Sequence, residues 1–219
     1  MLSDAAFLAM DFAARDRTDL GNAFINAYLE KTGDYASLPM LRWYLTFRSL
    51  VRAKVAAIRA VELGDANSGH RRAIADCIAH IKLARRFTNP SPRWLWITHG
   101  PSGSGKTRGS ETVVQTHGAI RFRSDVERKR HHGLDPLDRP DAAERRRLYS
   151  PEATDATYRR LARLARASIG DGYCVVVDAT FLKRSQRDHF RQLADSLGAG
   201  FSILNYQADA ETLRCLLYT

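Results

Sequence analysis

The chain has 219 residues and an apolar fraction of 44%, which is enough to build a core and excludes wholesale disorder. It has no run of about 18 apolar residues, and charges interrupt Met1–Leu20, so neither a membrane-spanning helix nor a secretory signal is expected. The net charge of +10, with 28 arginines among 34 basic residues, suits anionic partners, although solvated helix faces explain most of it. We therefore expect a cytoplasmic protein with no membrane partner.

Residues 1–89 show helical spacing of apolar side chains throughout. One segment ends near Gly33, which suits a helix C-terminal cap, and a longer segment follows Pro39. A third segment follows Gly69. On the long segment, the apolar residues at helical spacing are Leu41, Tyr44, Leu45, Val51, Val55 and Ile58. Because no strand-like alternation occurs, residues 1–89 are predicted to form a helical bundle.

The pattern changes at Asn89-Pro90-Ser91-Pro92, a stretch that cannot continue a helix and suits a linker. Over residues 93–219, strands and helices then alternate, with helical stretches at about 153–169 and 185–197. This alternation predicts an α/β fold, with a parallel sheet covered by helices on both faces. The strand candidates are Trp94–Thr98, Ala119–Phe122, Tyr173–Val177 and Phe201–Tyr206.

The order of these elements indicates an incomplete sheet. About four parallel strands are found here, and the strand that would close the sheet is missing. The sequence stops at Tyr218-Thr219, inside the helix expected after Phe201–Tyr206, and Met1 falls inside the first expected helix. We therefore expect a fragment of a longer protein, or the product of a shortened reading frame.

A phosphate-binding motif occupies residues 100–107, whose sequence GPSGSGKT fits G-x-x-x-x-G-K-[ST] in full between a predicted strand and a predicted helix. Its glycines let backbone N–H groups point at phosphate oxygens, and the positive end of the following helix strengthens this anion site. Lys106 would reach the β- and γ-phosphates, and Thr107 would ligate magnesium. The sequence therefore predicts a site for ATP and Mg²⁺, with the binding residues Gly100, Ser102, Gly103, Ser104, Gly105, Lys106 and Thr107.

Two carboxylates follow predicted strands, where a kinase needs them. Asp125 could accept the proton of an attacking hydroxyl or hold a magnesium-bound water, and the alternative is a helix N-cap, which Ser124 would also serve. Arg128 could hold an acceptor phosphate or carboxylate. Asp178 ends the apolar run Val175–Val177 in a Walker-B pattern and would support magnesium, the alternative being a turn residue.

The combination of GPSGSGKT, RSDVERKR, YSPEATDATY and VVVDATF resembles the small-molecule P-loop kinase module of bacterial AAA-family ATPases. In those proteins the module follows an aminoglycoside-phosphotransferase-like domain, and DAAFLAMDF, KTGDY and RAKVAAIRA resemble the tail of that preceding lobe. The D-x-x-R of Asp125 and Arg128 is also similar to polynucleotide 5′-kinases, zeta toxins and gluconate kinases. This resemblance implies that Asp125 is the base and that Arg128 contacts the acceptor.

The chain departs from the resemblance in two respects. Residues 1–89 lack an H-x-D loop with a downstream asparagine and a metal-binding aspartate, so we expect no kinase activity from them. The late arginine-bearing lid that such kinases close over the phosphates is also missing from the sequence.

Three functions are compatible with these residues. The first is an ATP-dependent phosphotransferase acting on a small hydroxylated acceptor, with Lys106 and Thr107 on the phosphate side and Asp125 and Arg128 on the acceptor side. The second uses the 5′-hydroxyl of RNA or DNA as the acceptor, which the basic surplus favours and the lack of a clear aromatic stacking platform disfavours. The third is a nucleotide-binding module without catalysis.

Overall fold

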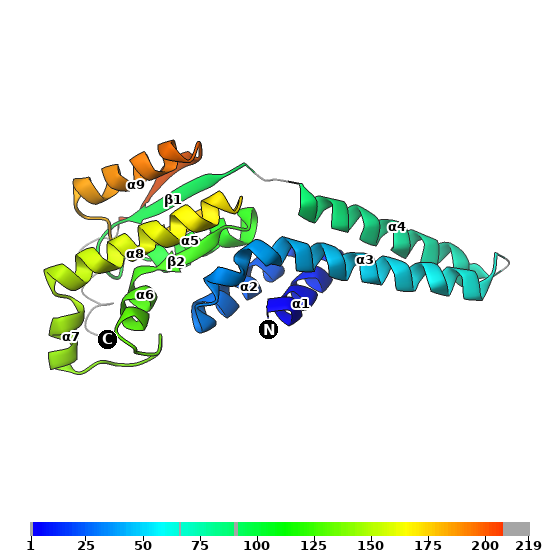
Figure 1. Cartoon of the computed structure of the whole chain (residues 1–219), viewed down its shortest axis with the longest axis horizontal. Helices are drawn as coiled ribbons and strands as arrows, with labels where there is room; N and C mark the ends of the chain where they lie inside the picture. The colour runs from blue at the N-terminus through cyan, green and yellow to red at the C-terminus, as the bar shows by residue number, and fades with distance from the viewer. Residues whose placement is uncertain (1, 66, 90–91, 208–219) are drawn as a thin grey trace. The chain divides into compact units, whose positions relative to one another are not determined.

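The structure, a computed structural model, describes residues 2–65, 67–89 and 92–207 (Figure 1). Both Pro90-Ser91 of the expected linker and the expected final helix up to Tyr218-Thr219 lie outside the described residues. The chain divides into two compact units, the first made of Met1–Tyr28 and Asp34–Pro90, the second of Leu29–Gly33 and Ser91–Thr219. Among the described residues, no helix combines the length and the apolar character that crossing a membrane requires.

The helical character predicted for the N-terminal segment is confirmed. Gly33 follows the second helix with a φ of +72°, which is the left-handed conformation of a helix cap, and Pro39 lies in the first turn of the long third helix. Asn67 caps the fourth helix by accepting a hydrogen bond from the backbone N–H of Gly69. The elements are α1 (Leu2–Ala14), α2 (Thr18–Thr32), the short 3-10 helix η1 (Tyr35–Ser37), α3 (Leu38–Leu63) and α4 (Ser68–Thr88).

Only part of the apolar set predicted on α3 is buried: Leu41 is 4% exposed and Leu45 packs against a buried cluster, whereas the residues further along the helix are exposed. Val51, Val55 and Ile58 are 38%, 56% and 48% exposed. The buried side of α3 carries Ala53 and Ala60 instead, because small side chains let two helix backbones approach closely. Helical periodicity therefore predicted the helix correctly, and it predicted the packed side only for the first part of α3.

The second unit holds a sheet whose four described strands, in the order β2-β3-β1-β4, are all parallel. The predicted α/β fold, a parallel sheet of about four strands preceded by an all-helical segment, is thus confirmed. Its elements are β1 (Trp94–His99), α5 (Lys106–His117), β2 (Ile120–Arg123), α6 (Ser124–His131), α7 (Ala142–Leu148), α8 (Pro151–Gly170), β3 (Val175–Asp178), α9 (Arg184–Ser196) and β4 (Gly200–Asn205).

The strand order decides which helices cover which face of the sheet. In the sheet, β3 lies between β1 and β2, so the connection from β1 to β2 passes over the position that β3 later fills. The chain then returns to form β3, and the connection from β3 to β4 passes over β1. Since crossover connections are right-handed, α5 lies on one face, and α8 and α9 lie on the other. Accordingly α5 packs against Val176 and the two tryptophans Trp94 and Trp96, while β3 is buried on both faces.

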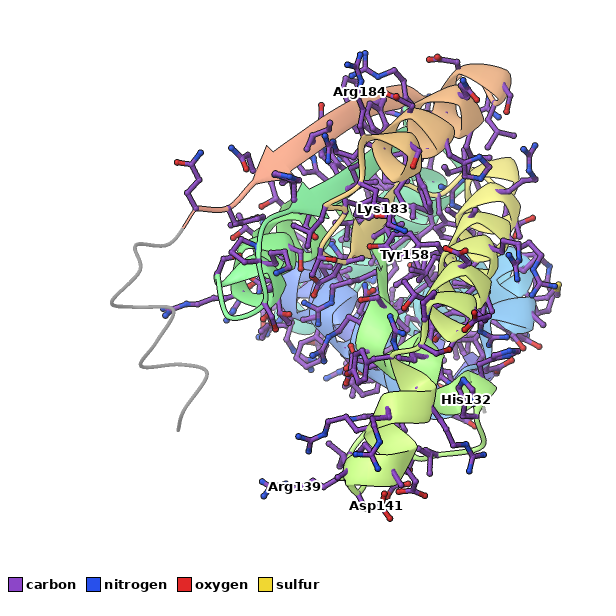
Figure 2. All side chains as sticks on the ribbon, turned by 90° about the vertical axis from the view of Figure 1, so that its left-hand side faces the viewer. His132, Arg139, Asp141, Tyr158, Lys183 and Arg184 are labelled. Carbon is purple, nitrogen blue, oxygen red and sulfur yellow. The ribbon has the colours of Figure 1, made fainter. Side chains whose placement is uncertain are left out.

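Parallel strands bring their carboxyl ends to one edge of the sheet, and Figure 2 looks onto this edge. In the register of the sheet Ile97 lies beside Val177, and Arg123 lies beside Asp178. The loops that follow β1, β2 and β3 therefore start close together, and the residues predicted to carry the chemistry lie on these loops.

Candidate functional site

The loop between β1 and α5 has the backbone conformation that its sequence motif requires. Gly100, Gly103 and Gly105 have φ values of +144°, +80° and +79°, which side-chain-bearing residues rarely adopt. A Cβ atom at Gly100 would collide with the backbone carbonyl oxygen of Tyr206. Because no side chain caps the N-terminus of α5, the N–H groups of its first turn are available to an anion held by the loop.

A fourth glycine, Gly109 in the first turns of α5, is required by packing. Glycine inside a helix costs about 1 kcal/mol relative to alanine. A Cβ atom at this position would overlap the side-chain ring of Tyr206, which follows β4. The residue therefore gives up helix propensity so that α5 and the segment after β4 can lie in contact.

Lys106 lies across the loop. Its side chain is only 9% exposed, and its ammonium group donates a hydrogen bond to the carbonyl of Pro101 and lies 3.5 Å from Ser104 Oγ. Burial lowers the pKa of Lys106, and the negative charge of Asp178 opposes this shift. A partly desolvated cation in this position attracts phosphate oxygens more strongly than it would in bulk water. Ser102, the remaining loop residue of the prediction, is exposed.

Thr107 and Asp178 meet beside this loop. Thr107 Oγ1 donates a hydrogen bond of 2.7 Å to Asp178 Oδ2, although the two residues are 71 positions apart in the chain. Asp178 is 5% exposed, and Arg123 Nε lies 3.9 Å from the same carboxylate oxygen. A hydroxyl and one carboxylate fit Mg²⁺, which binds few protein oxygens and completes its shell with water and substrate phosphates. The described residues contain no cluster of three or more His, Cys, Asp or Glu side chains that could hold a metal ion by themselves.

The loop after β3 is held in place by a buried network. Thr98 Oγ1 donates to the carbonyl of Ala179 at 2.6 Å and accepts from the N–H of the same residue at 3.0 Å. Phe181 has a positive φ of +47°, which costs a non-glycine residue about 1–2 kcal/mol. Its ring is fully buried, edge-on to Phe190, and its N–H donates to the Tyr158 hydroxyl at 3.1 Å. Figure 2 labels Tyr158, which belongs to α8.

Asp125 lies in the first turn of α6, next to two donors. Tyr149 Oη donates to Asp125 Oδ1 at 2.7 Å, and Lys129 Nζ lies 3.1 Å from Oδ2. Burial acts to raise the pKa of Asp125, but the hydrogen bonds from Tyr149 and Lys129 outweigh it and hold that pKa below its ordinary value. The alternative role of Asp125 or Ser124 as a helix cap is not realised, because no side chain caps α6.

Arg128 is buried rather than open to a ligand. Its side chain is 6% exposed, and its Nη1 donates to the carbonyl of Leu148 at 2.6 Å and to Thr154 Oγ1 at 3.1 Å. Its guanidinium also lies 4.5 Å from the centre of the Tyr149 ring. Arg128 thus ties the end of α7 and the start of α8 to α6, and its contact with an acceptor remains a prediction.

Two contributors to this region were missed by sequence reasoning. Burial, followed by the hydrogen bond to Asp125, raises the pKa of Tyr149 to about 12, so its hydroxyl stays protonated and can donate throughout the neutral range. Glu127 is fully buried and forms ion pairs with Arg130 and Arg160, the latter at 2.7 Å. In the sequence, Glu127 stands among basic residues with no signal of burial, and Tyr149 was visible only as part of the segment YSPEATDATY.

The predicted residues therefore form two groups along one edge of the sheet. The residues predicted to bind phosphate and metal are the loop with Lys106, Thr107 and Asp178, and those predicted to act on an acceptor, Asp125 and Arg128, lie together with the unpredicted Tyr149. The register that pairs Arg123 with Asp178 sets both groups at the carboxyl end of the sheet.

Comparison with known proteins agrees with this geometry. Residues 95–215 match a family model described as an AAA domain. Uncharacterized proteins of Mycobacterium bovis and of two strains of Mycobacterium tuberculosis are each 31% identical over 193 residues, which cover 88% of this chain and 38% of the relative. The chain thus spans well under half the length of these curated relatives. No solved structure matches the chain.

Proposed function

The chain belongs to the AAA domain family, and on that premise we propose that it is an ATP- and Mg²⁺-dependent phosphotransferase that phosphorylates a hydroxyl of a small acceptor. Family membership by itself implies nucleotide binding through a P-loop domain. The observation that carries the proposal further is the 2.7 Å hydrogen bond from Thr107 Oγ1 to Asp178 Oδ2, beside a loop with three positive-φ glycines. Phosphoryl transfer needs an oxygen-ligand pair of this kind beside the phosphates.

On the phosphate side, the loop N–H groups and Lys106 bind the β- and γ-phosphates, and Thr107 and Asp178 hold the metal ion with its waters. Bound Mg²⁺ supplies neutralisation of the phosphate charge. Since Lys106 is already desolvated by the surrounding loop, little solvent reorganisation is needed when charge develops on the phosphate oxygens.

On the acceptor side, Asp125 accepts the proton of the acceptor hydroxyl while that oxygen forms its bond to the γ-phosphorus. The bond from the γ-phosphorus to the β–γ bridging oxygen breaks, and ADP leaves. Because its pKa is held low, Asp125 is ionised at neutral pH and is ready to accept a hydrogen bond from the hydroxyl. Arg128 orients the acceptor, either directly or by holding the segment around Tyr149.

We assign this chemistry to residues 93–219 alone. Residues 1–89 are proposed to be a separate helical domain that resembles the tail of a phosphotransferase-like lobe and has no kinase activity of its own. A chain beginning at residue 93 would test this division by its capacity to bind Mg²⁺ and ATP.

The first experiment is a thermal-shift titration of the whole chain with Mg²⁺ and ATP. We expect stabilisation that rises with ligand, is lost in Lys106→Ala, and is kept in Lys82→Ala, which removes an exposed lysine of the first unit. Transfer from γ-labelled ATP to a panel of small hydroxylated compounds follows, and Lys106→Met should abolish it. Full activity of that variant would contradict the proposal, and stabilisation without any product would favour the non-catalytic module.

A further inference from the structure

A second basic site lies away from the loops at the sheet edge. It is a groove of about 610 Å³ along the outer side of α8, where α8 packs against both α6 and α9 (Figure 1). Its floor is formed by small and apolar side chains of Ala156, Ala162 and Leu193. The remaining lining residues are all basic: His131 of α6, Arg159, Arg163 and Arg166 of α8, and His189 of α9.

The arginines of this groove are not neutralised by the protein. No carboxylate lines the groove, and within the described part of the chain Arg159, Arg163 and Arg166 have neither an ion pair nor a hydrogen-bond partner. Their neighbour Arg160 behaves differently, because its Nε lies 2.7 Å from the buried carboxylate of Glu127. On the same helix, one arginine thus supports the fold, while three are left available for an external anion.

This arrangement is unfavourable for the isolated helix. Arg159 and Arg163 are spaced i,i+4, and Arg163 and Arg166 are spaced i,i+3, so both pairs repel, and Asp155, four residues before Arg159, offsets only part of this repulsion. An anion bound along the groove would remove this repulsion and would bring no cost of breaking an existing ion pair. The three arginines also form a row about 10 Å long, at 1.5 Å of rise per residue. A row of cations fits a linear polyanion better than a single phosphate group.

We propose that this groove binds single-stranded nucleic acid through its phosphodiester backbone. The three guanidinium groups pair with successive phosphates, as in grooves that track a single strand. The imidazole rings of His131 and His189 supply the flat surfaces on which unpaired bases stack. The sequence showed no stacking platform because these two rings come from α6 and α9, which only the fold brings to one groove. The proposal does not depend on phosphoryl transfer at the P-loop.

The test measures binding of a short fluorescent single-stranded RNA to the full chain without ATP, as a function of salt. Each phosphate contact contributes about 0.7 to the slope of log K against log salt for a single strand. The variant Arg159→Gln/Arg163→Gln should therefore show a salt dependence that is less steep by about 1.4 in the slope. It should also bind the RNA about tenfold more weakly, or weaker still, at 0.1 M salt. The matched control is Arg139→Gln/Arg146→Gln, which removes two exposed arginines outside the groove, of which Figure 2 shows Arg139 pointing away from the molecule.

The outcomes are separable because all four substituted residues are exposed and folding is monitored in parallel. The groove variant should melt at the same or a slightly higher temperature at low salt, since a repulsion is relieved. An unchanged slope, an equal loss in both variants, or no RNA binding by the unaltered chain at low salt overturns the proposal. Binding of inorganic polyphosphate without binding of RNA overturns it as well.

Discussion

The phosphate side and the acceptor side of the site are built in different ways. On the phosphate side, one continuous loop and the start of α5 supply every residue except Asp178. On the acceptor side, the hydrogen bond between Tyr149 and Asp125 spans 24 positions, and the one between Arg128 and Leu148 spans 20. The residues that a short motif carries, including Asp125 and Arg128, could be predicted from the sequence, whereas the contact of Tyr149 with Asp125, which a returning chain makes, could not.

The two sides also differ in exposure. Lys106 and Asp178 are 9% and 5% exposed, whereas the side chain of Asp125 is 45% exposed. Buried charges hold one geometry before the nucleotide arrives, and an exposed carboxylate can be reached by an acceptor from solvent. The proposed phosphate site is therefore preformed, while the proposed acceptor site combines the exposed Asp125 with Arg128, which is only 6% exposed.

Among substitutions on the proposed acceptor side, Asp125→Asn has the largest expected effect. Loss of a general base lowers rates by about 10²–10⁴-fold, and because the carboxylate belongs to the acceptor side, stabilisation by Mg²⁺ and ATP should not change. Transfer from γ-labelled ATP and thermal shift are measured on the same protein, with the exposed Asp155→Asn as control. If nucleotide binding were lost together with transfer, the two sides of the site would not be independent.

A smaller effect, on stability, is expected from Arg128→Met. The buried carbonyl of Leu148 loses its donor, which should lower the free energy of unfolding by about 1–3 kcal/mol. Chemical denaturation measures this, and Arg146→Met, which removes an exposed arginine of α7, should stay within about 0.5 kcal/mol. If the variant keeps its stability and only the KM for the acceptor rises, Arg128 contacts the acceptor directly.

The smallest effect is expected from Tyr149→Phe. Losing one of the hydrogen bonds that lower the pKa of Asp125 should move that pKa upward, which NMR titration of the carboxyl group would detect. A carboxyl group whose pKa is lower in the folded protein stabilises the folded state above the unfolded-state pKa, and this stabilisation is lost as pH falls through the folded-state pKa. Because the variant has a higher folded-state pKa, it should lose part of this stabilisation. Transfer should fall at most about tenfold, since one neutral hydrogen bond contributes about 1 kcal/mol. An unchanged Asp125 pKa would show that this hydrogen bond does not tune the carboxylate.

Features that depend on short-range interactions could be predicted from the sequence, whereas features that depend on contacts between distant residues could not. The strand before the P-loop, the tight curl of its glycine-rich backbone and the position of Asp178 at a strand end all depend on neighbouring residues, and they were predicted. The packed side of the later part of α3 was not predicted, because small residues such as Ala53 are buried there. Glu127 was missed because its burial depends on two arginines, one of them on α8.

The amino-acid sequence by itself determined the alternation of elements, the P-loop and the family, since turn geometry, periodicity and motif spacing act over a few residues. The tertiary structure alone decided that Thr107 meets Asp178, that Tyr149 reaches Asp125, and that three arginines of α8 share one groove with two histidines. These contacts depend on strand order and crossover handedness, which bring together residues that are far apart in the chain. The unpaired charges along α8 follow from the same cause, because a helical row of arginines becomes a groove only when α6 and α9 pack beside it.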